Sequence, residues 1–188
     1  MPKENKVKSE IITAARGLIY EQGYLETSIT DIMRNADVGK GQLYYYFDTK
    51  KEIGMDVLEQ LDQEWRADLI GEILAPQRPA TESIKLMFEW LLDFHQEQDH
   101  YYGCPIGNVI IEMSNKDEDY RLLLKNLIET WESELDAKLM QLEIRDTDIS
   151  AEYIISTLQG AIMLTKLDET NRPLERAISK LSTQLNIV

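Results

Sequence analysis

The sequence is poor in the features that mark secreted and membrane proteins. It has one cysteine in 188 residues, Cys104, so an intramolecular disulfide is excluded. No apolar run reaches the roughly 18 residues that a membrane-spanning helix needs. The first ten residues, MPKENKVKSE, lack the apolar stretch of a secretory signal. We therefore expect a cytoplasmic protein with no membrane segment.

Catalytic and cofactor-binding motifs are also missing. The sequence contains no G-x-S-x-G, no phosphate-binding loop and no dinucleotide fingerprint. His95, His100 and Cys104 are the one group of metal-ligand or nucleophile side chains that lie close in sequence. A zinc site needs three or four converging ligands, and the spacing of the two histidines places them on different helix faces. We expect no metal, no cofactor and no enzyme activity; a helical enzyme is an alternative that rests on this group alone.

The charge is distributed unevenly along the chain. The formal net charge is −14, which by itself argues against nucleic acid as a partner. Residues 1–51 hold eight Lys and Arg against seven Asp and Glu, so 12 of the 20 basic and 27 of the 34 acidic residues follow residue 51. A near-neutral N-terminal part followed by an acidic remainder is compatible with DNA binding by the first part alone. The simpler alternative is an acidic surface that keeps the protein in solution.

Apolar residues recur at three- and four-residue steps along most of the chain, as Ile11, Ala15 and Leu18 do near the N-terminus. Alternation of the β type does not extend over any useful length. The sequence therefore predicts an all-α fold of about nine helices. We expect these helices over approximately 7–22, 28–36, 40–47, 49–73, 84–95, 109–114, 117–142, 150–167 and 173–185.

Three helix boundaries have recognisable signals. Gly23 can adopt the left-handed conformation that ends a helix. Ser28 and Asp31 have the spacing of a capping box, in which each side chain bonds the other residue's backbone N–H. Thr49 and Glu52 repeat that spacing before the long helix that follows. These signals place helix ends on both sides of residues 29–47.

Residues 29–47 have the spacing of a helix-turn-helix motif. A short helix is followed by the turn 37–39 and by a second short helix. Leu43 and Phe47 are four residues apart and share the inward face of the second helix. The first turn of that helix, Lys40-Gly41-Gln42, is the part that this motif directs at base edges in the major groove.

The residues of this first turn suit DNA chemically. Gln42 offers a donor and an acceptor, which together match adenine N6 and N7. Gly41 has no side chain and would let the backbone approach the duplex closely. Lys40 supplies a point charge for a phosphate. We therefore expect this turn to contact both bases and backbone.

Three consecutive tyrosines, Tyr44, Tyr45 and Tyr46, follow the first turn. At about 100° per residue they sweep around the helix, so no single core face can bury them all. Their rings can cover sugar and their hydroxyls can donate to phosphate oxygens, while Lys50 adds charge at the next helix start. The competing interpretation is a surface helix with partly buried tyrosines in a generic helical protein.

Residues 8–55 resemble the N-terminal DNA-binding domain of the tetracycline-repressor (TetR) family. The matching segment is AARGLIYEQGYLETSITDIMRNADVGKGQLYYYFDTKKEI, with Gly-Tyr at 23–24, Thr-Ser at 27–28, KGQLYYYF and Lys50 at signature positions. The segment GCPIGN, residues 103–108, resembles the start of the ligand-binding domain in one subgroup of the family. The rest of the chain resembles the family in length and helix count.

The resemblance implies a role for each matching residue. It implies phosphate contacts for Thr27, Ser28 and Lys50. It implies base contacts for Lys40, Gly41 and Gln42, and backbone contacts for Tyr44 and Tyr46. Two positions differ from the family pattern: Asp37 stands where a turn glycine is usual, and Gly39 where a serine is usual. Gly39 has no side-chain oxygen, so we expect no phosphate contact from it.

One helix-turn-helix makes few contacts, so we expect a homodimer that reads two half-sites about 34–36 Å apart. The segment ISAEYIISTLQGAIMLTKL, residues 149–167, is apolar on several faces. We expect the interface in the region of Ile154, Leu158 and Ile162 and on the C-terminal helix, with Gly160 allowing close approach. The alternative is a helix buried within its own protomer.

The resemblance also implies a small-molecule effector. Aromatic residues and methionine suit an adaptable apolar pocket, although at helical spacing they also suit an ordinary core. We expect a DNA-binding domain over 1–50, a ligand-binding and dimerisation domain over 51–188, and a repressor that binds a palindromic operator. A small-molecule-binding protein with a vestigial DNA-binding domain is the alternative. The candidate pocket residues are Trp65, Trp90, Phe94, Tyr101, Tyr102, Cys104, Met113, Tyr120 and Trp131.

Overall fold

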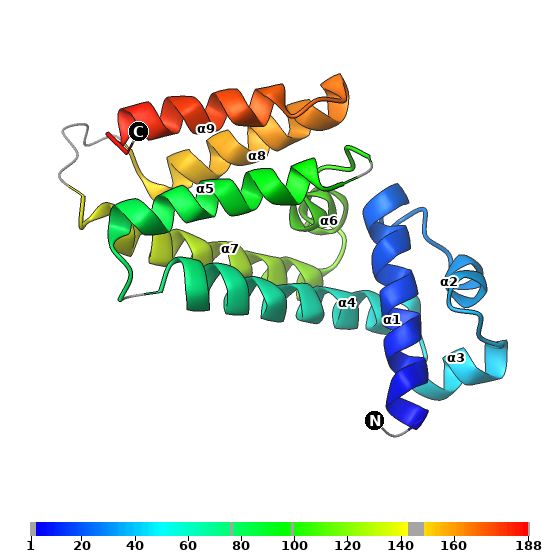
Figure 1. Ribbon diagram of the computed structural model, residues 1–188. Helices are drawn as coiled ribbons and strands as arrows, with labels where there is room; N and C mark the ends of the chain where they lie inside the picture. The colour runs from blue at the N-terminus through cyan, green and yellow to red at the C-terminus, as the bar shows by residue number, and fades with distance from the viewer. Residues whose placement is uncertain (1–2, 76, 99, 143–148, 188) are drawn as a thin grey trace. The chain divides into compact units, whose positions relative to one another are not determined.

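The computed structural model of the chain is described for residues 3–75, 77–98, 100–142 and 149–187 (Figure 1). Every regular element in these ranges is a helix, which confirms the predicted all-α fold. In chain order the elements are α1 (Lys3–Gln22), α2 (Ile29–Asn35), α3 (Lys40–Tyr46), α4 (Lys50–Trp65), the π-helix η1 (Arg66–Ile73), α5 (Ala80–Gln96), α6 (Pro105–Met113), α7 (Glu118–Leu139), α8 (Ala151–Asp168) and α9 (Arg172–Gln184).

The chain forms two compact units. We call the first, Met1–Gln63 with Asn108–Leu124, the head unit. The second, Glu64–Gly107 with Lys125–Val188, is the body unit. Most of α4 and the segment 108–124 therefore group with the first three helices. The division after residue 50 stays a prediction about domains, and the compact units follow packing rather than order in the sequence.

The core of the head unit is formed by the inward faces of α1, α2, α3 and α4. Ile11, Ile32, Leu43 and Ile53 are completely buried, and Phe47 is 3% exposed. The shared inward face predicted for Leu43 and Phe47 is thereby confirmed. In Figure 1, α2 and α3 lie on the same side of α1. Burial of one apolar residue per turn fixes which face of α3 remains outside.

Hydrogen bonds at the helix ends fix the short helices. Ser28 caps α2, since its Oγ accepts the Asp31 N–H at 3.1 Å while the Asp31 carboxylate accepts the Ser28 N–H at 3.3 Å. Gly23 ends α1 at φ 92°, and Asp37 occupies the turn before α3 at φ 52°. The left-handed conformation at Asp37 agrees with its place at a position where glycine is usual, because Asp tolerates that region better than most residues.

The start of α4 differs slightly from the expected capping box. The Glu52 N–H donates to Thr49 Oγ1 at 3.2 Å, as predicted. The Glu52 carboxylate, however, accepts the N–H of Asp48 at 2.8 Å, one residue before the cap. The last turns of the predicted helix 49–73 form the π-helix η1, in which the Leu74 N–H donates to Leu69 O at 2.8 Å.

Tyr24 and Tyr120 pack together in the head unit. Their ring centroids are 5.2 Å apart, and Tyr120 is fully buried. Gly54 on α4 makes room for both rings, because a Cβ there would lie 2.0 Å from Tyr120 Oη and 2.6 Å from Tyr24 Cε2. Tyr120 therefore belongs to the core of the head unit, although it comes from the start of α7.

The body unit contains α8 and α9 side by side, with α5 against α9 (Figure 1). Ile154 and Leu158 are 0% exposed and Ile162 is 2% exposed, so these three side chains belong to the protomer core. The prediction that they form the dimer surface is corrected on this point. The reason is that α8 carries apolar residues on two opposite faces, and the sequence does not say which of them turns inward.

The buried ammonium of Lys138 stabilises a turn of the body unit. Lys138 is 2% exposed, and its ammonium donates to Ala75 O and Arg78 O at 2.7 Å each. Burial lowers the pKa of Lys138.

The helix predicted from Val109 begins earlier, at Pro105, because proline fits the first turn of a helix where no intrahelical donor is needed. Cys104 Sγ accepts the Gly107 N–H at 3.3 Å and so replaces a capping oxygen.

Candidate nucleic-acid interface

The outer face of α3 consists of the residues predicted to approach DNA. Lys40, Gly41 and Gln42 are exposed, whereas Leu43 next to them is completely buried. The inward packing of Leu43 thus orients the first turn of α3 outward. This turn is therefore the part of α3 that is accessible to a partner.

Gln42 has a structural role in addition to the predicted one. Its Oε1 accepts the backbone N–H of Gly39 at 3.0 Å, which supplies a cap that glycine cannot provide with a side chain. The amide oxygen keeps a second lone pair and the NH₂ group keeps its donors, so the donor–acceptor pair expected for adenine is retained in this conformation. The spacing of Gly39 and Gln42 is that of a capping box, so the sequence already contained this signal.

The tyrosines of α3 extend the exposed surface. Tyr45 is 69% exposed and Tyr44 is 42% exposed, while Tyr46 is half-buried. The rings of Tyr45 and Tyr46 meet edge to face with centroids 4.9 Å apart. Lys40 Nζ lies 5.8 Å from the centroid of the Tyr44 ring, a cation–π distance. Lys40 and the three phenol rings are therefore all at least partly exposed on α3.

Thr27 and Ser28, both predicted to bind phosphate, lie in different environments. Ser28 is exposed at the N-terminus of α2. Thr27 is 1% exposed, and its Oγ1 donates to Gly23 O at 2.7 Å. Burial removes the Thr27 side chain from any phosphate, so its placement favours a role in closing the end of α1. The hydrogen bond from Ser28 lowers the pKa of Asp31, which keeps a negative charge beside this cap.

Lys50 is also held inside the head unit. Its ammonium donates to Tyr24 O and Thr27 O at 3.0 Å and to Leu25 O at 3.4 Å. It lies 4.4 Å from the centroid of the Tyr24 ring. An ammonium has three donors, and three carbonyls face them here. The phosphate contact of Lys50 stays a prediction, and the geometry favours a structural role.

Three of the predicted effector-binding residues come together in the body unit. The Trp65 ring lies 5.6 Å from Trp90 and 5.2 Å from Trp131, both edge to face. Trp131 is 1% exposed, and its Nε1 donates to Met87 Sδ at 3.3 Å. The side chains come from α4, α5 and α7. They form an aromatic cluster of the kind that can serve either as core or as the wall of an apolar site.

The other predicted effector residues are dispersed. Met113 and Tyr120 are buried and group with the head unit. Cys104 is buried; Gln159 Nε2 donates to its Sγ at 3.5 Å, and burial raises the pKa of the thiol. Phe94 meets the His95 ring edge to face at 5.1 Å. Tyr101 and Tyr102 are half-buried. Their roles in effector binding stay predictions.

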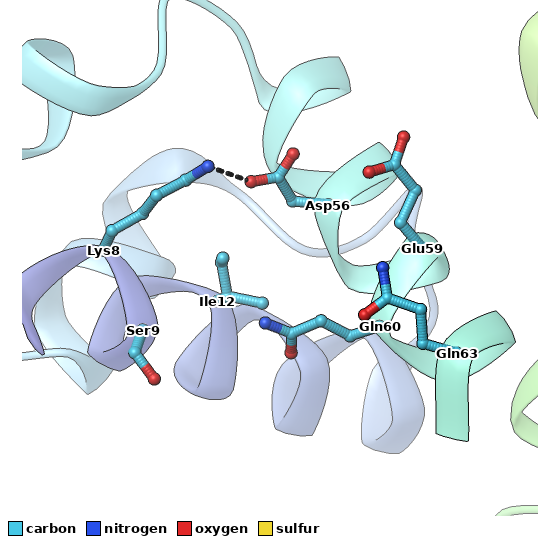
Figure 2. Close-up of a pocket in the computed structure, with 7 residues that line it drawn as sticks. All are labelled: Lys8, Ser9, Ile12, Asp56, Glu59, Gln60 and Gln63. Carbon is cyan, nitrogen blue, oxygen red and sulfur yellow. Dashed lines mark ion pairs between the residues drawn. The ribbon is translucent and has the colours of Figure 1, made fainter. Parts of the chain in front are cut away.

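A groove of about 320 Å³ lies between α1 and α4 of the head unit (Figure 2). Lys8 and Asp56 form an ion pair of 2.6 Å across it. None of the residues predicted to bind an effector line this groove, and its wall is mostly polar. It therefore does not suit the apolar effector expected from the sequence. The lining residues are Lys8, Ser9, Ile12, Asp56, Glu59, Gln60 and Gln63.

The described part of the chain contains no group of three or more His, Cys, Asp and Glu residues placed to hold a metal ion. His95 is 5% exposed, and burial lowers its pKa to about 4. No helix within the described ranges is long and apolar enough to cross a membrane.

Comparison with known protein families identifies both parts of the chain. The sequence profile described as "Bacterial regulatory proteins, tetR family" matches residues 11–53. A second profile, "Transcriptional regulator LmrA/YxaF-like, C-terminal domain", matches residues 80–180. The chain belongs to the TetR family. The resemblance inferred from residues 8–55 is thus confirmed, and the protein is a DNA-binding transcriptional regulator of this family.

Curated relatives of this TetR-family chain are similar over nearly its whole length. An HTH-type transcriptional regulator in the lacX 3' region of Lactococcus lactis is 35% identical over 184 residues, covering 96% of this chain and 94% of the relative. The HTH-type transcriptional repressor DhaR of Mycobacterium sp. (strain GP1) is 23% identical over 180 residues, covering 92% and 89%. The HTH-type transcriptional regulator LmrA of Bacillus subtilis is 26% identical over 171 residues, covering 89% and 90%.

Solved structures share the fold. A TetR transcriptional regulator from Chloroflexus aurantiacus superposes with a TM-score of 0.84 at 24% identity, covering 99% of this chain and 97% of the other. The regulatory protein TetR from Rhodobacter sphaeroides gives a TM-score of 0.80 at 22% identity, covering 94% and 97%. At these identities the likeness shows the fold, and the function rests on the family membership.

Proposed function

We propose that the protein is a ligand-responsive repressor that binds a palindromic operator as a homodimer and is released by a small apolar or aromatic effector. The observation that carries the DNA-binding part is the outward first turn of α3, with Lys40 and Gln42 exposed beside buried Leu43. The same observation speaks against the alternative of a small-molecule-binding protein with a vestigial head. A repressor role is supported by the relative DhaR, which is a transcriptional repressor.

The homodimer is supported by an exposed stripe on α8. Tyr153, Gly160, Leu164 and Leu167 follow one another at steps of seven, four and three residues, which places them on one face of the helix. Leu167 is 77% exposed and Leu164 is 43% exposed, and Met163 beside them is 60% exposed. An added Cβ at Gly160 would meet nothing within 4 Å, so a second helix has room to approach there.

Symmetry explains why this stripe suits a second copy of the chain. A twofold axis places the same surface on both partners, so one apolar helix face is complementary to itself. TetR-family regulators typically dimerise. We infer that the outward face of α8, together with α9, replaces the predicted region around Ile154, Leu158 and Ile162 as the dimer surface.

Effector binding is supported by the tryptophan cluster of the body unit. Ser83 lies one helical turn before Met87 on α5, is fully buried, and its hydroxyl has no hydrogen-bond partner within the described ranges. A buried hydroxyl without a partner is costly, so a ligand group that bonds it would be favoured. The proposed effector is accordingly apolar or aromatic with at least one hydrogen-bonding group.

DNA binding is tested by selecting duplexes from a random-sequence library with the full-length protein. The expected product is a palindrome whose half-site centres are about 10 base pairs apart or a multiple of that spacing. Gln42→Ala should relax the preference at one base pair by ~1–3 kcal/mol. Gln42→Glu, whose carboxylate still accepts the Gly39 N–H, separates base reading from capping. If the library yields no bound duplex, the operator proposal fails.

Effector binding is tested by tryptophan fluorescence. All three tryptophans of the chain belong to the cluster in the body unit, so quenching reports on that unit alone. Small aromatic compounds that quench the fluorescence should also release the selected duplex from the protein. Quenching without release would contradict the proposed ligand response. A coupling free energy of ~1–3 kcal/mol suffices to change operator affinity about 5- to 150-fold.

A further inference from the structure

The connection between α1 and α2, residues 23–28, is held by two charged side chains from outside the helix-turn-helix motif. We call this segment the α1–α2 loop. Glu112 on α6 accepts the Leu25 N–H at 2.9 Å through its Oε2. Lys50 on α4 donates to three carbonyls of the same loop. The Glu112 carboxylate thus accepts a hydrogen bond from a backbone N–H of the loop, and the Lys50 ammonium donates hydrogen bonds to its backbone carbonyls.

Gly23 makes the approach of Glu112 possible. Its φ is 92°, and a Cβ there would lie 2.3 Å from Glu112 Oε1. A side chain at this position would therefore displace the carboxylate as well as strain the backbone. The loop, Glu112 and Lys50 all belong to the head unit.

The two charges also interact with each other. Burial lowers the pKa of Lys50, and the carboxylates of Glu112 and Glu26 oppose that shift. Removing Glu112 therefore removes the hydrogen bond to the loop and weakens the electrostatic support of the ammonium.

This loop leads directly into the part of α2 that is predicted to meet the DNA backbone. It ends at Ser28, the exposed cap of α2, and Thr27 just before it is buried with its hydroxyl bonded to Gly23 O. A shift of the loop would shift the Ser28 cap and the first N–H groups of α2 with it. Phosphate contacts set the register of a protein on the duplex, so such a shift changes affinity without touching a base contact.

We propose that Glu112 and Lys50 are positioning residues for DNA binding, which hold the α1–α2 loop in the conformation that presents the N-terminus of α2 to the backbone. Glu112 lies outside residues 11–53, the segment matched by the DNA-binding profile. Lys50 acts on the loop rather than on a phosphate, which replaces the role that the resemblance implied for it. The inference uses the DNA-binding function of the family and is independent of any effector.

The test measures the affinity of the full-length protein for the duplex selected from the random library, over a series of salt concentrations. Glu112→Ala should weaken binding about tenfold, because only the fraction of molecules with a correctly placed loop binds. Glu112→Gln should restore most of the affinity, since the amide oxygen still accepts the Leu25 N–H. Glu112→Asp keeps the charge but is shorter by one methylene, and should resemble the alanine variant. Glu129→Ala, an exposed glutamate of α7, is the matched control.

The salt dependence separates positioning from phosphate binding. Lys50→Met should weaken binding while the slope of log affinity against log salt stays at its wild-type value. Loss of one phosphate contact would instead reduce that slope by about 0.9, and this result would overturn the role proposed for Lys50. Wild-type affinity in both Glu112→Ala and Glu112→Asp would overturn the role proposed for Glu112.

A measurement without DNA keeps the inference testable if no duplex is selected. Hydrogen exchange of the Leu25 amide should accelerate at least about tenfold in Glu112→Ala and remain near wild type in Glu112→Gln, since the bond protects this N–H. Unchanged exchange in Glu112→Ala would show that the carboxylate does not hold the loop. Failure of the operator proposal and failure of the positioning proposal are thereby distinguishable.

Discussion

The head unit and the body unit are stabilised in different ways. In the head unit α2 and α3 have seven residues each, and their N-terminal ends are fixed by Ser28 and Gln42. In the body unit α8 has 18 residues, and large side chains such as Trp131 are buried. Helices of two turns are not stable alone, so their position depends on contacts from elsewhere in the chain. The stability of the head unit therefore depends on individual contacts, whereas the stability of the body unit depends on the burial of large apolar surfaces.

The largest expected effect comes from overfilling the head unit. Gly54→Ala should lower the free energy of unfolding by ~3 kcal/mol, because the new methyl group overlaps Tyr120 and Tyr24. Gly17→Ala on α1 is the control, since a Cβ there meets nothing within 4 Å and should raise stability by ~0.5–1 kcal/mol. Urea unfolding followed by circular dichroism measures both. Equal free energies of unfolding in the two variants would contradict the dependence of head-unit stability on individual contacts.

The next effect concerns the apolar surface of the body unit. Leu164→Glu with Leu167→Glu places charges on the proposed dimer face, and the symmetry of a twofold interface counts each change twice. The dissociation constant of the dimer should rise at least about 100-fold, which corresponds to ~3 kcal/mol of association free energy. Met140→Glu, an 85% exposed methionine of the body unit, is the control and should remain dimeric. Sedimentation velocity at several concentrations measures the association, and an intact double variant would contradict the proposed interface.

The smallest effect is a pH dependence of the body unit. The pKa of His95 is about 4 in the folded protein because of burial, whereas an unfolded histidine titrates near 6.5. Between these values the unfolded chain binds a proton that the folded chain does not, so stability falls as the pH falls from about 6.5 towards 4, by up to ~1.4 kcal/mol per unit. His95→Phe should flatten this dependence, whereas an unchanged dependence in that variant would contradict the role of His95. Unfolding curves at pH 7 and pH 5 decide between these outcomes.

The sequence predicted well wherever a local pattern determines the structure. The capping box of Ser28 and Asp31 needs only residues three apart, and Gly23 and Asp37 adopt the left-handed backbone that glycine and, less readily, aspartate tolerate. The burial of Leu43 and Phe47 follows from helical spacing. These are contacts within one helix or one turn, where the chain itself brings the partners together.

Prediction was poorer where two remote segments meet. Lys50 resembles a phosphate-binding residue by position, yet its ammonium donates to three carbonyls of the α1–α2 loop, which lies more than 20 residues earlier in the chain. Glu112 was missed altogether, because nothing in the pattern around it distinguishes it from a solvent-exposed glutamate. The apolar residues of α8 were recognised, but the choice between its two faces depends on what packs against them.

The sequence by itself determined that the chain is helical, that α3 presents Lys40 and Gln42 outward, and that the family is TetR, because periodicity, caps and a local signature carry those facts. Only the tertiary structure decided that Glu112 and Lys50 hold the α1–α2 loop, that Gly54 admits two tyrosine rings, and that Leu164 rather than Leu158 lies on the surface. The physical reason is that these contacts join residues far apart in sequence, and local preferences contain no information about such distances.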